Sequence, residues 1–163
     1  MPNPTHNTNI SFKIATTNLE FDDAKNLFQE YANTLDIDLC FQDFDSELKT
    51  INQQYHKPKG ALLLAYKDEI AIGCVGLREF DKDIAELKRM FVKTDYRGYK
   101  IGEKLLDQII DVAKNMSYKK ILLDTLPSMA QAQKLYRSFG FHEIPSYRFN
   151  PIEGAVFMER RLT

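Results

Sequence analysis

The sequence contains no tryptophan, only two cysteines and almost no net charge: its formal charge is −1 at pH 7 over 163 residues. Cys40 and Cys74 fit neither the spacing of a metal site nor a disulfide framework, so we expect no bound metal and no disulfide. A net charge close to zero provides no bulk attraction to phosphate backbones, which disfavours nucleic acid as a partner.

Long hydrophobic runs are also missing from the sequence. We recognise neither a signal peptide nor a membrane-spanning segment, and therefore expect no membrane partner and a cytoplasmic location. Residues 1–9 are polar and include two prolines and three asparagines, which predicts a flexible tail. Residues 10–163 are sufficient for one domain with a buried core.

Apolar residues alternate as in strands in some segments and recur at helical spacing in others. This pattern predicts an α+β fold, close to α/β, with a central mixed and mostly antiparallel sheet of about six to seven strands flanked by about four helices. The predicted strands are residues 10–16, 60–66, 70–80, 84–93, 119–124, 141–145 and 154–160. The predicted helices are one capped by Asn18 or Asp22 and ending near residue 34, and residues 46–55, 100–116 and 127–139.

The junction between the predicted strand at residues 84–93 and the predicted helix at residues 100–116 has the features of an anion site. A helix start carries unpaired backbone N–H groups and about half a positive charge, which stabilise a bound phosphate. Arg97 can add a charge-assisted contact, and Gly98 and Gly102 leave room for a ligand close to the backbone. We therefore predict that this turn binds a pyrophosphate.

Two motifs in their expected elements resemble the GNAT superfamily of N-acetyltransferases. The first is R-G-x-x-x-G at residues 97–102, with Lys100 where the family has its middle glycine. The second, A-x-x-L-Y-x-x-x-G-F, is matched in full at residues 132–141, although Met129 stands where an asparagine is common. The resemblance covers nearly the whole chain and implies binding of acetyl-CoA and transfer of its acetyl group to an amine.

The resemblance also implies how acetyl-CoA is bound. The pyrophosphate would lie at the turn, the pantetheine arm along the preceding strand, and the thioester where two parallel strands splay apart. The implied cofactor-binding residues are Met90, Phe91, Val92, Arg97, Gly98, Tyr99, Lys100, Ile101, Gly102, Glu103 and Met129.

Two residues are candidates for catalysis. Glu86 lies eleven residues before Arg97, where part of the family has a glutamate general base; the alternative is a structural carboxylate paired with Lys88 or Arg78. Tyr136 stands where the family places a tyrosine at the CoA sulfur, and a phenol can donate a proton to the leaving thiolate. On spacing alone, Tyr136 would be an ordinary core aromatic.

Candidate acceptor-binding residues are less clear from the sequence. Asp38 and Phe41 lie in an acidic, aromatic segment that could attract a cationic amine, or that could be a solvated loop. Tyr147 and Arg148 lie in the last loop, where Arg148 could meet a substrate carboxylate.

The prediction is an enzyme that acetylates the primary amine of a small or amino-acid-like molecule. The alternatives are a protein N-terminal or lysine acetyltransferase and a non-catalytic acyl-CoA-binding module. The family is often dimeric, so a homodimer is possible.

Overall fold

The structure is a computed structural model that describes residues 9–35 and 43–162. Its centre is a seven-stranded sheet with the order β1-β2-β3-β4-β5-β7-β6. The strands are β1 (Ile10–Ile14), β2 (Ala61–Lys67), β3 (Ile70–Asp81), β4 (Ile84–Val92), β5 (Lys120–Thr125), β6 (His142–Ile144) and β7 (Val156–Arg161). All neighbours are antiparallel except β4 and β5, which are parallel.

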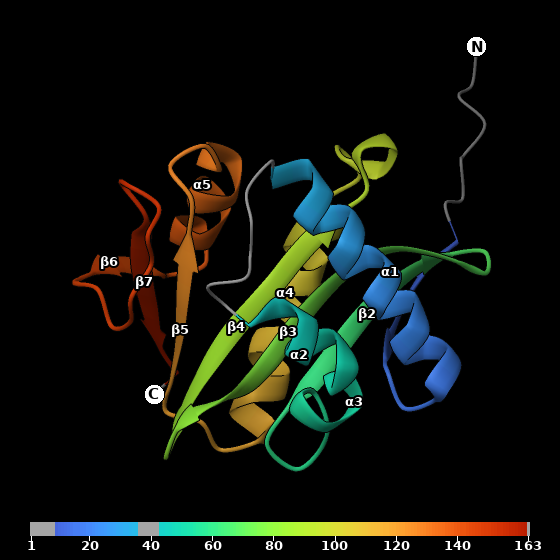
Figure 1. Ribbon diagram of the computed structural model, residues 1–163, viewed down its shortest axis with the longest axis horizontal. Coiled ribbons are helices and arrows are strands. Elements are labelled where there is room, and N and C mark those ends of the chain that lie inside the picture. Colours follow the sequence, from blue (N-terminus) through green and yellow to red (C-terminus); the bar gives the residue numbers. More distant parts are fainter. Residues whose placement is uncertain (1–8, 36–42, 163) are drawn as a thin grey trace.

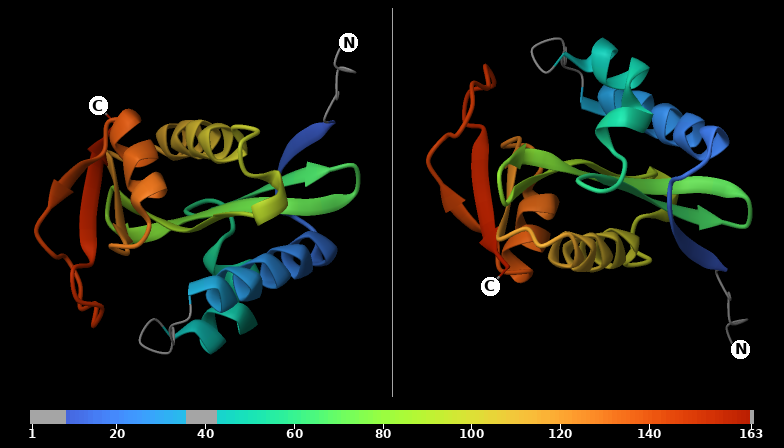
Figure 2. Two further views of the ribbon diagram at one scale, coloured as in Figure 1. Left: turned by 90° about the horizontal axis from the view of Figure 1, so that it is seen from above. Right: turned by 90° about the horizontal axis from the view of Figure 1, so that it is seen from below.

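The five α-helices of the described residues cover both faces of the sheet. Figure 1 looks onto the sheet, and Figure 2 shows it edge-on with helices on either side. One face carries α4 (Ile101–Asn115) and α5 (Ala130–Ser138), and the other carries α1 (Asn18–Leu35), α2 (Phe44–Lys49) and α3 (Ile51–Gln54). A short 3-10 turn, η2 (Thr94–Tyr96), connects β4 to α4. The predicted α+β fold with a mixed, mostly antiparallel sheet is confirmed.

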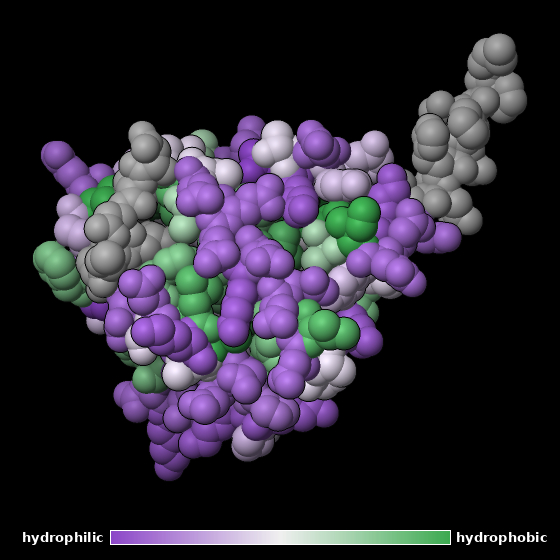
Figure 3. Space-filling view, turned by 45° about the vertical axis from the view of Figure 1, so that its right-hand side comes forward, coloured by the Kyte–Doolittle hydropathy of each residue, from purple (hydrophilic) through white to green (hydrophobic). Residues whose placement is uncertain are grey.

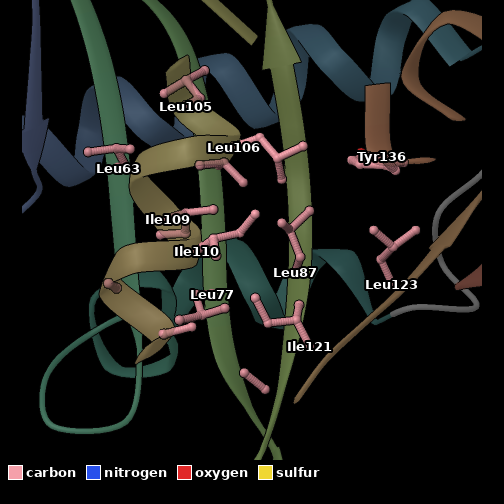
Figure 4. Packing of buried hydrophobic residues seen from close by; sticks show 14 of the residues in the cluster. Leu63, Leu77, Leu87, Leu105, Leu106, Ile109, Ile110, Ile121, Leu123 and Tyr136 are labelled. Carbon is pink, nitrogen blue, oxygen red and sulfur yellow. The ribbon is translucent and has the colours of Figure 1, made fainter. Parts of the chain in front are cut away.

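Each face of the sheet has its own hydrophobic core because strand side chains alternate between the faces. Leu63, Leu87 and Leu123 pack with α4 and α5 in the larger core (Figure 4), whereas Leu64 and Phe91 pack with α1 to α3 in the smaller one. The helical spacing in α4 was predicted correctly, and its apolar side chains are buried. The face of the molecule seen in Figure 3 is mostly hydrophilic, with separate hydrophobic areas.

Helix α1 begins with a reciprocal capping arrangement that differs from the prediction. The Thr17 hydroxyl accepts a hydrogen bond from the Glu20 N–H at 3.2 Å, and the Glu20 carboxylate accepts from the Thr17 N–H at 3.0 Å. Neither Asn18 nor Asp22 is the cap, because the T-x-x-E pair satisfies two helix-start donors at once. Burial acts to raise the pKa of Glu20, but the ion pair with Lys13 at 2.6 Å and these hydrogen bonds outweigh it and lower the pKa to about 2.

One further feature differs from the prediction. The helix predicted at residues 46–55 is instead two short helices, Phe44–Lys49 and Ile51–Gln54, because Thr50 between them leaves the helical conformation with φ −116° and ψ 21°. The described residues therefore contain five flanking helices, where about four were predicted. The predicted tail, residues 1–9, lies almost wholly outside the described residues.

Strand β4 contains a bulge that repositions its side chains. Two steps on β3, from Cys74 to Gly76, oppose three on β4, from Phe91 to Lys88, and the extra residue Arg89 has φ 58°. In a regular strand, residues three apart face opposite sides of the sheet. Because of the bulge, Leu87 and Met90 both face the α4 side. Lys88 and Arg89 are left on the side of α1 to α3, where Arg89 reaches α2.

The parallel pair β4 and β5 is short. It comprises only three registered positions and ends at Glu86 opposite Leu122, after which the strands separate. Figure 4 shows Leu87 and Leu123 on either side of this opening, with Tyr136 of α5 close to it. This opening is the centre of the candidate site.

Candidate active site

A groove of about 870 Å³ follows β4 from the start of α4 to the opening between β4 and β5. Its walls come from the end of α1, from β4, from the turn at residues 96–103, from the end of β5 and from the start of α5. Segments far apart in the sequence therefore meet at this groove. The groove joins the predicted phosphate turn to the predicted site of acetyl transfer.

At the outer end of the groove, the first turn of α4 has no side-chain cap. Its N-cap residue Lys100 adopts the left-handed conformation with φ 60° and ψ 25°, so lysine occupies the backbone shape that a glycine would supply. Ile101, Gly102 and Glu103 line the groove at this point. No side chain of the N-cap residue therefore occupies the first-turn N–H groups, which is the arrangement that suits a bound anion.

Around this turn, Gly102 and Arg97 lie at the groove, whereas Tyr99 lies outside its lining. A Cβ on Gly102 would stand 3.7 Å from Leu135, an ordinary contact distance, so packing within the protein does not require glycine there. The missing side chain instead leaves room on the groove side. Arg97 lines the groove and donates from Nε to the Val92 carbonyl at 3.3 Å, whereas Tyr99 is about half exposed and lies outside the lining.

The middle of the groove is apolar. Met90, Phe91, Val92 and Met129 all line it. Tyr136 lines it from α5 with only 6% of its surface exposed, and burial raises the pKa of its phenol well above the usual value. Tyr136 is therefore protonated at neutral pH and able to donate a hydrogen bond into the groove.

Met129 forms a contact between the two helices that border the groove. The Tyr31 hydroxyl on α1 lies 3.9 Å from the Met129 sulfur, and the Thr125 hydroxyl lies 3.6 Å from the same atom. Burial raises the pKa of Tyr31 to about 12. The α1 end and the α5 start are thus joined across the groove by side chains.

The inner end of the groove is polar and lies on the side of the sheet that faces α1 to α3. Lys88, Asp124 and Asn150 line it, and the Asn150 amide donates to Asp124 Oδ2 at 3.2 Å. Lys88 is only 4% exposed. Burial and repulsion from Arg89 lower the pKa of Lys88 to about 8, although the Glu86 and Asp124 carboxylates offset part of this effect.

Glu86 is fully buried and lines a second hollow instead of the groove. Its Oε1 accepts from Nε and Nη2 of Arg78 at 3.3 and 3.2 Å. Its Oε2 accepts from the Tyr147 hydroxyl at 2.8 Å and lies 2.5 Å from Nη2 of Arg148. The carboxylate thus holds the loop before β7 against β4.

The predicted site residues that the structure describes fall into two groups. The predicted cofactor residues other than Tyr99 line the groove, and so does Tyr136. Tyr147 and Arg148 meet at Glu86, outside the groove lining, and Asp38 and Phe41 lie outside the described residues.

Sequence reasoning missed Lys88, Asp124, Asn150 and Tyr31 as groove residues. The sequence did contain a pattern that could have indicated two of them, Asp124 and Lys88. Asp124 directly follows a buried apolar strand, and Lys88 interrupts another.

Comparison with known proteins identifies the class. Residues 21–141 match the family described as "Acetyltransferase (GNAT) family". The chain is 36% identical over 159 residues to an uncharacterised N-acetyltransferase of Schizosaccharomyces pombe, covering 96% of this chain and 97% of that protein. It is 32% identical over 125 residues to an N-acetylaspartate synthetase of Xenopus tropicalis, covering 71% of this chain and 46% of that protein.

A crystal structure of a GNAT-family acetyltransferase from Staphylococcus aureus has the same fold, with a TM-score of 0.79 at 27% identity over 94% of this chain and 99% of that one. The fold and the matches define an acyltransferase. The chain belongs to the GNAT family of N-acetyltransferases. Within the described residues, no helix is long and apolar enough to cross a membrane.

Proposed function

We propose that the protein transfers the acetyl group of acetyl-CoA to the primary amine of a small molecule. The observation that carries this proposal is the continuous groove, which joins an uncapped helix start to a polar chamber at the opening of β4 and β5. The N-acetylaspartate synthetase named among its relatives supports a small, amino-acid-like acceptor over a protein.

The residues present fit a pyrophosphate and a pantetheine arm. The uncapped N–H groups of α4, together with Arg97 and Lys100, supply donors and positive charge for phosphate oxygens. Beyond the opening, β4 no longer pairs with β5, so backbone groups on that edge are available to the amides of an extended ligand. The apolar middle of the groove suits the remainder of the arm.

The acceptor amine must lose a proton before it attacks. A lysine-like amine has a pKa of about 10.4 and is mostly protonated near pH 7. Two carboxylates stand on the acceptor side of the opening. Glu86 is the general base predicted from the sequence, acting directly or through water, and Asp124 is a second candidate.

The contacts of the two carboxylates favour Asp124 as the base. Glu86 already receives donors from two arginines and a tyrosine, whereas Asp124 lines the groove and accepts a hydrogen bond from the Asn150 amide. Asp124→Asn and Glu86→Gln separate the two roles. If Asp124 is the base, Asp124→Asn should lose the acidic limb of the pH–rate profile. Glu86→Gln should then keep that limb and change KM.

Tyr136 is proposed as the general acid. The attacking nitrogen forms a bond to the acetyl carbon and gives a proton to the base carboxylate, and the carbon–sulfur bond breaks. The leaving thiolate takes the proton of the Tyr136 phenol, directly or within a hydrogen bond, and a phenolate so formed regains its proton from the protonated base or from water. Tyr136→Phe should lower kcat by about 10²- to 10⁴-fold with little change in KM. A rise in KM with unchanged kcat would make Tyr136 a packing residue.

The proposed function is tested by the release of free thiol from acetyl-CoA across a panel of small amines. We expect release that depends on the amine and that far exceeds hydrolysis. No release above hydrolysis with any amine, combined with tight acetyl-CoA binding by calorimetry, would instead indicate an acyl-CoA-binding module. Acetylation of peptides but of no small amine would indicate a protein acetyltransferase.

A further inference from the structure

A second hollow, of about 490 Å³, lies beside the end of β3 and the loop before β7. Its described lining includes three formal cations, Lys59, Arg78 and Arg148, but only two carboxylates, Glu79 and Glu86. Lys59 and Glu79 form an ion pair at 3.1 Å on the exposed side. The two arginines are left to share the single buried carboxylate of Glu86.

The two arginines are not equally satisfied. Arg78 donates from Nε and Nη2 to Glu86 and from Nη1 to the Gln54 side chain at 2.8 Å. Arg148 contacts Glu86 through Nη2, and its guanidinium carbon lies 5.9 and 5.5 Å from the ring centroids of Phe80 and Tyr147. Arg78 is therefore a structural partner of Glu86, whereas Arg148 has donors to spare.

Arg148 also carries the clearest unsatisfied group of the molecule. Across residues 9–35 and 43–162, its Nε is the one buried side-chain nitrogen or oxygen without a hydrogen-bond partner. Leaving such a donor unpaired costs about 1–3 kcal/mol, more when the group is charged. The protein itself therefore leaves one donor of this cation without an acceptor.

The hollow and the groove are adjacent along two segments of the chain. On β4, Glu86 lines the hollow and Lys88 lines the groove, and alternate residues on one face of a strand are about 7 Å apart. On the loop before β7, Arg148 lines the hollow and Asn150 lines the groove. A molecule with an amine in the groove and an anionic group about one amino-acid side chain away can reach both.

We propose that Arg148 binds a carboxylate of the acceptor, so that the preferred acceptor is an acidic amino acid or a similar amine bearing a second, side-chain carboxylate. This inference rests on the proposed function. It explains why a guanidinium with unused donors lies against two aromatic rings, close to the acceptor end of the groove. A planar guanidinium is well suited to carboxylate recognition.

The test compares acceptors that differ only in charge at the side chain. Aspartate against asparagine, and glutamate against glutamine, are assayed by thiol release with wild type, Arg148→Gln, Arg148→Lys and the control Arg137→Gln. Arg137 is an exposed arginine of α5 paired with Glu143, and the same substitution removes the same charge there. Thermal unfolding and acetyl-CoA titration verify that each variant is folded.

We expect wild type to favour the carboxylate acceptor by at least tenfold in kcat/KM, because a hydrogen bond to a charged group contributes about 1.5–3 kcal/mol. The ratio should fall close to one in Arg148→Gln, take an intermediate value in Arg148→Lys and stay unchanged in Arg137→Gln. A wild-type ratio near one, or a ratio that survives in Arg148→Gln, would overturn the inference.

A binding measurement separates this inference from the proposed function. Succinate and glutarate, which carry carboxylates but no amine, are titrated calorimetrically into the CoA-saturated protein. Binding that weakens at least tenfold in Arg148→Gln but not in Arg137→Gln supports the carboxylate site even if no amine is acetylated. Turnover of neutral amines with Arg148-independent succinate binding would keep the proposed function and refute the carboxylate site.

Discussion

Lys100 is the residue at which the backbone and the charge of the phosphate turn can be tested separately. It holds φ 60° and ψ 25° at the N-cap of α4, a conformation that costs an L-residue about 1 kcal/mol. Lys100→Gly removes that cost, and Lys100→Ala keeps it. Both variants lose the same ammonium group from the groove.

We therefore expect Lys100→Gly to exceed Lys100→Ala by about 1 kcal/mol in free energy of unfolding, which corresponds to about 2–4 °C in Tm for a chain of this size. Lys100→Asn, which tolerates the left-handed region, should lie between them. Denaturant unfolding of the three variants measures this order. Equal stability of the glycine and alanine variants would refute the assignment of strain to Lys100.

The same variants report on charge. Acetyl-CoA titration should show both Lys100→Gly and Lys100→Ala binding about two- to fivefold more weakly than wild type, because an exposed ion pair contributes about 0.5–1 kcal/mol. Affinity equal to wild type in both would place the Lys100 ammonium away from the phosphates. Full affinity in the glycine variant alone would mean that the backbone shape, not the charge, governs binding.

Three further predictions concern stability. Glu20→Gln should cost about 1–2 kcal/mol at pH 7 through the lost cap and ion pair. Since the folded pKa of Glu20 is lowered from 4.5 to about 2, this difference should shrink as the pH falls from about 5 towards 2. Gly76→Ala should cost about 1–3 kcal/mol, because its Cβ would stand 2.6 Å from the fully buried Tyr55 ring. Lys88→Met should raise stability at pH 7 by up to about 3 kcal/mol, the equivalent of a pKa lowered from 10.5 to about 8. That gain should decline between pH 8 and 10.5, where the unfolded chain binds the proton that the folded protein has released.

Denaturant unfolding across pH measures each of these differences. A pH-independent cost for Glu20→Gln would mean that its carboxylate charge does not stabilise the cap. Full stability of Gly76→Ala would show that the Tyr55 ring can move despite the hydrogen bond from its hydroxyl to Glu47. A gain for Lys88→Met that persists at pH 10.5 would assign it to packing rather than to the buried charge.

The features predicted well from sequence were those encoded by short-range patterns. Alternating and helical spacing placed the strands, α1, α4 and α5 within a few residues, and the turn at Arg97 with the motif ending at Phe141 indicated the family. The family's motif at this turn has a glycine where Lys100 stands, and Lys100 adopts the left-handed conformation that a glycine favours. Such features depend on neighbours within about ten residues.

The contacts of Glu86 could not be predicted in the same way. They involve Arg78 from another strand and Tyr147 and Arg148 from a loop some sixty residues later, and only the folded sheet brings these groups together. The bulge at Arg89 had a similar effect, because it shifts which side chains face the acceptor side of the sheet. Asp124 and its hydrogen bond from Asn150 depend on where β4 and β5 separate, which strand patterns do not encode.

The central claim is acetyl transfer from acetyl-CoA to a small amine in the groove. Mass spectrometry of the amine panel after incubation with the protein and deuterated acetyl-CoA measures this transfer directly. We predict a labelled N-acetyl product with acidic amino acids. This product should form far more slowly with the Tyr136→Phe and Asp124→Asn variants. Thiol release without any labelled amine product would contradict the claim.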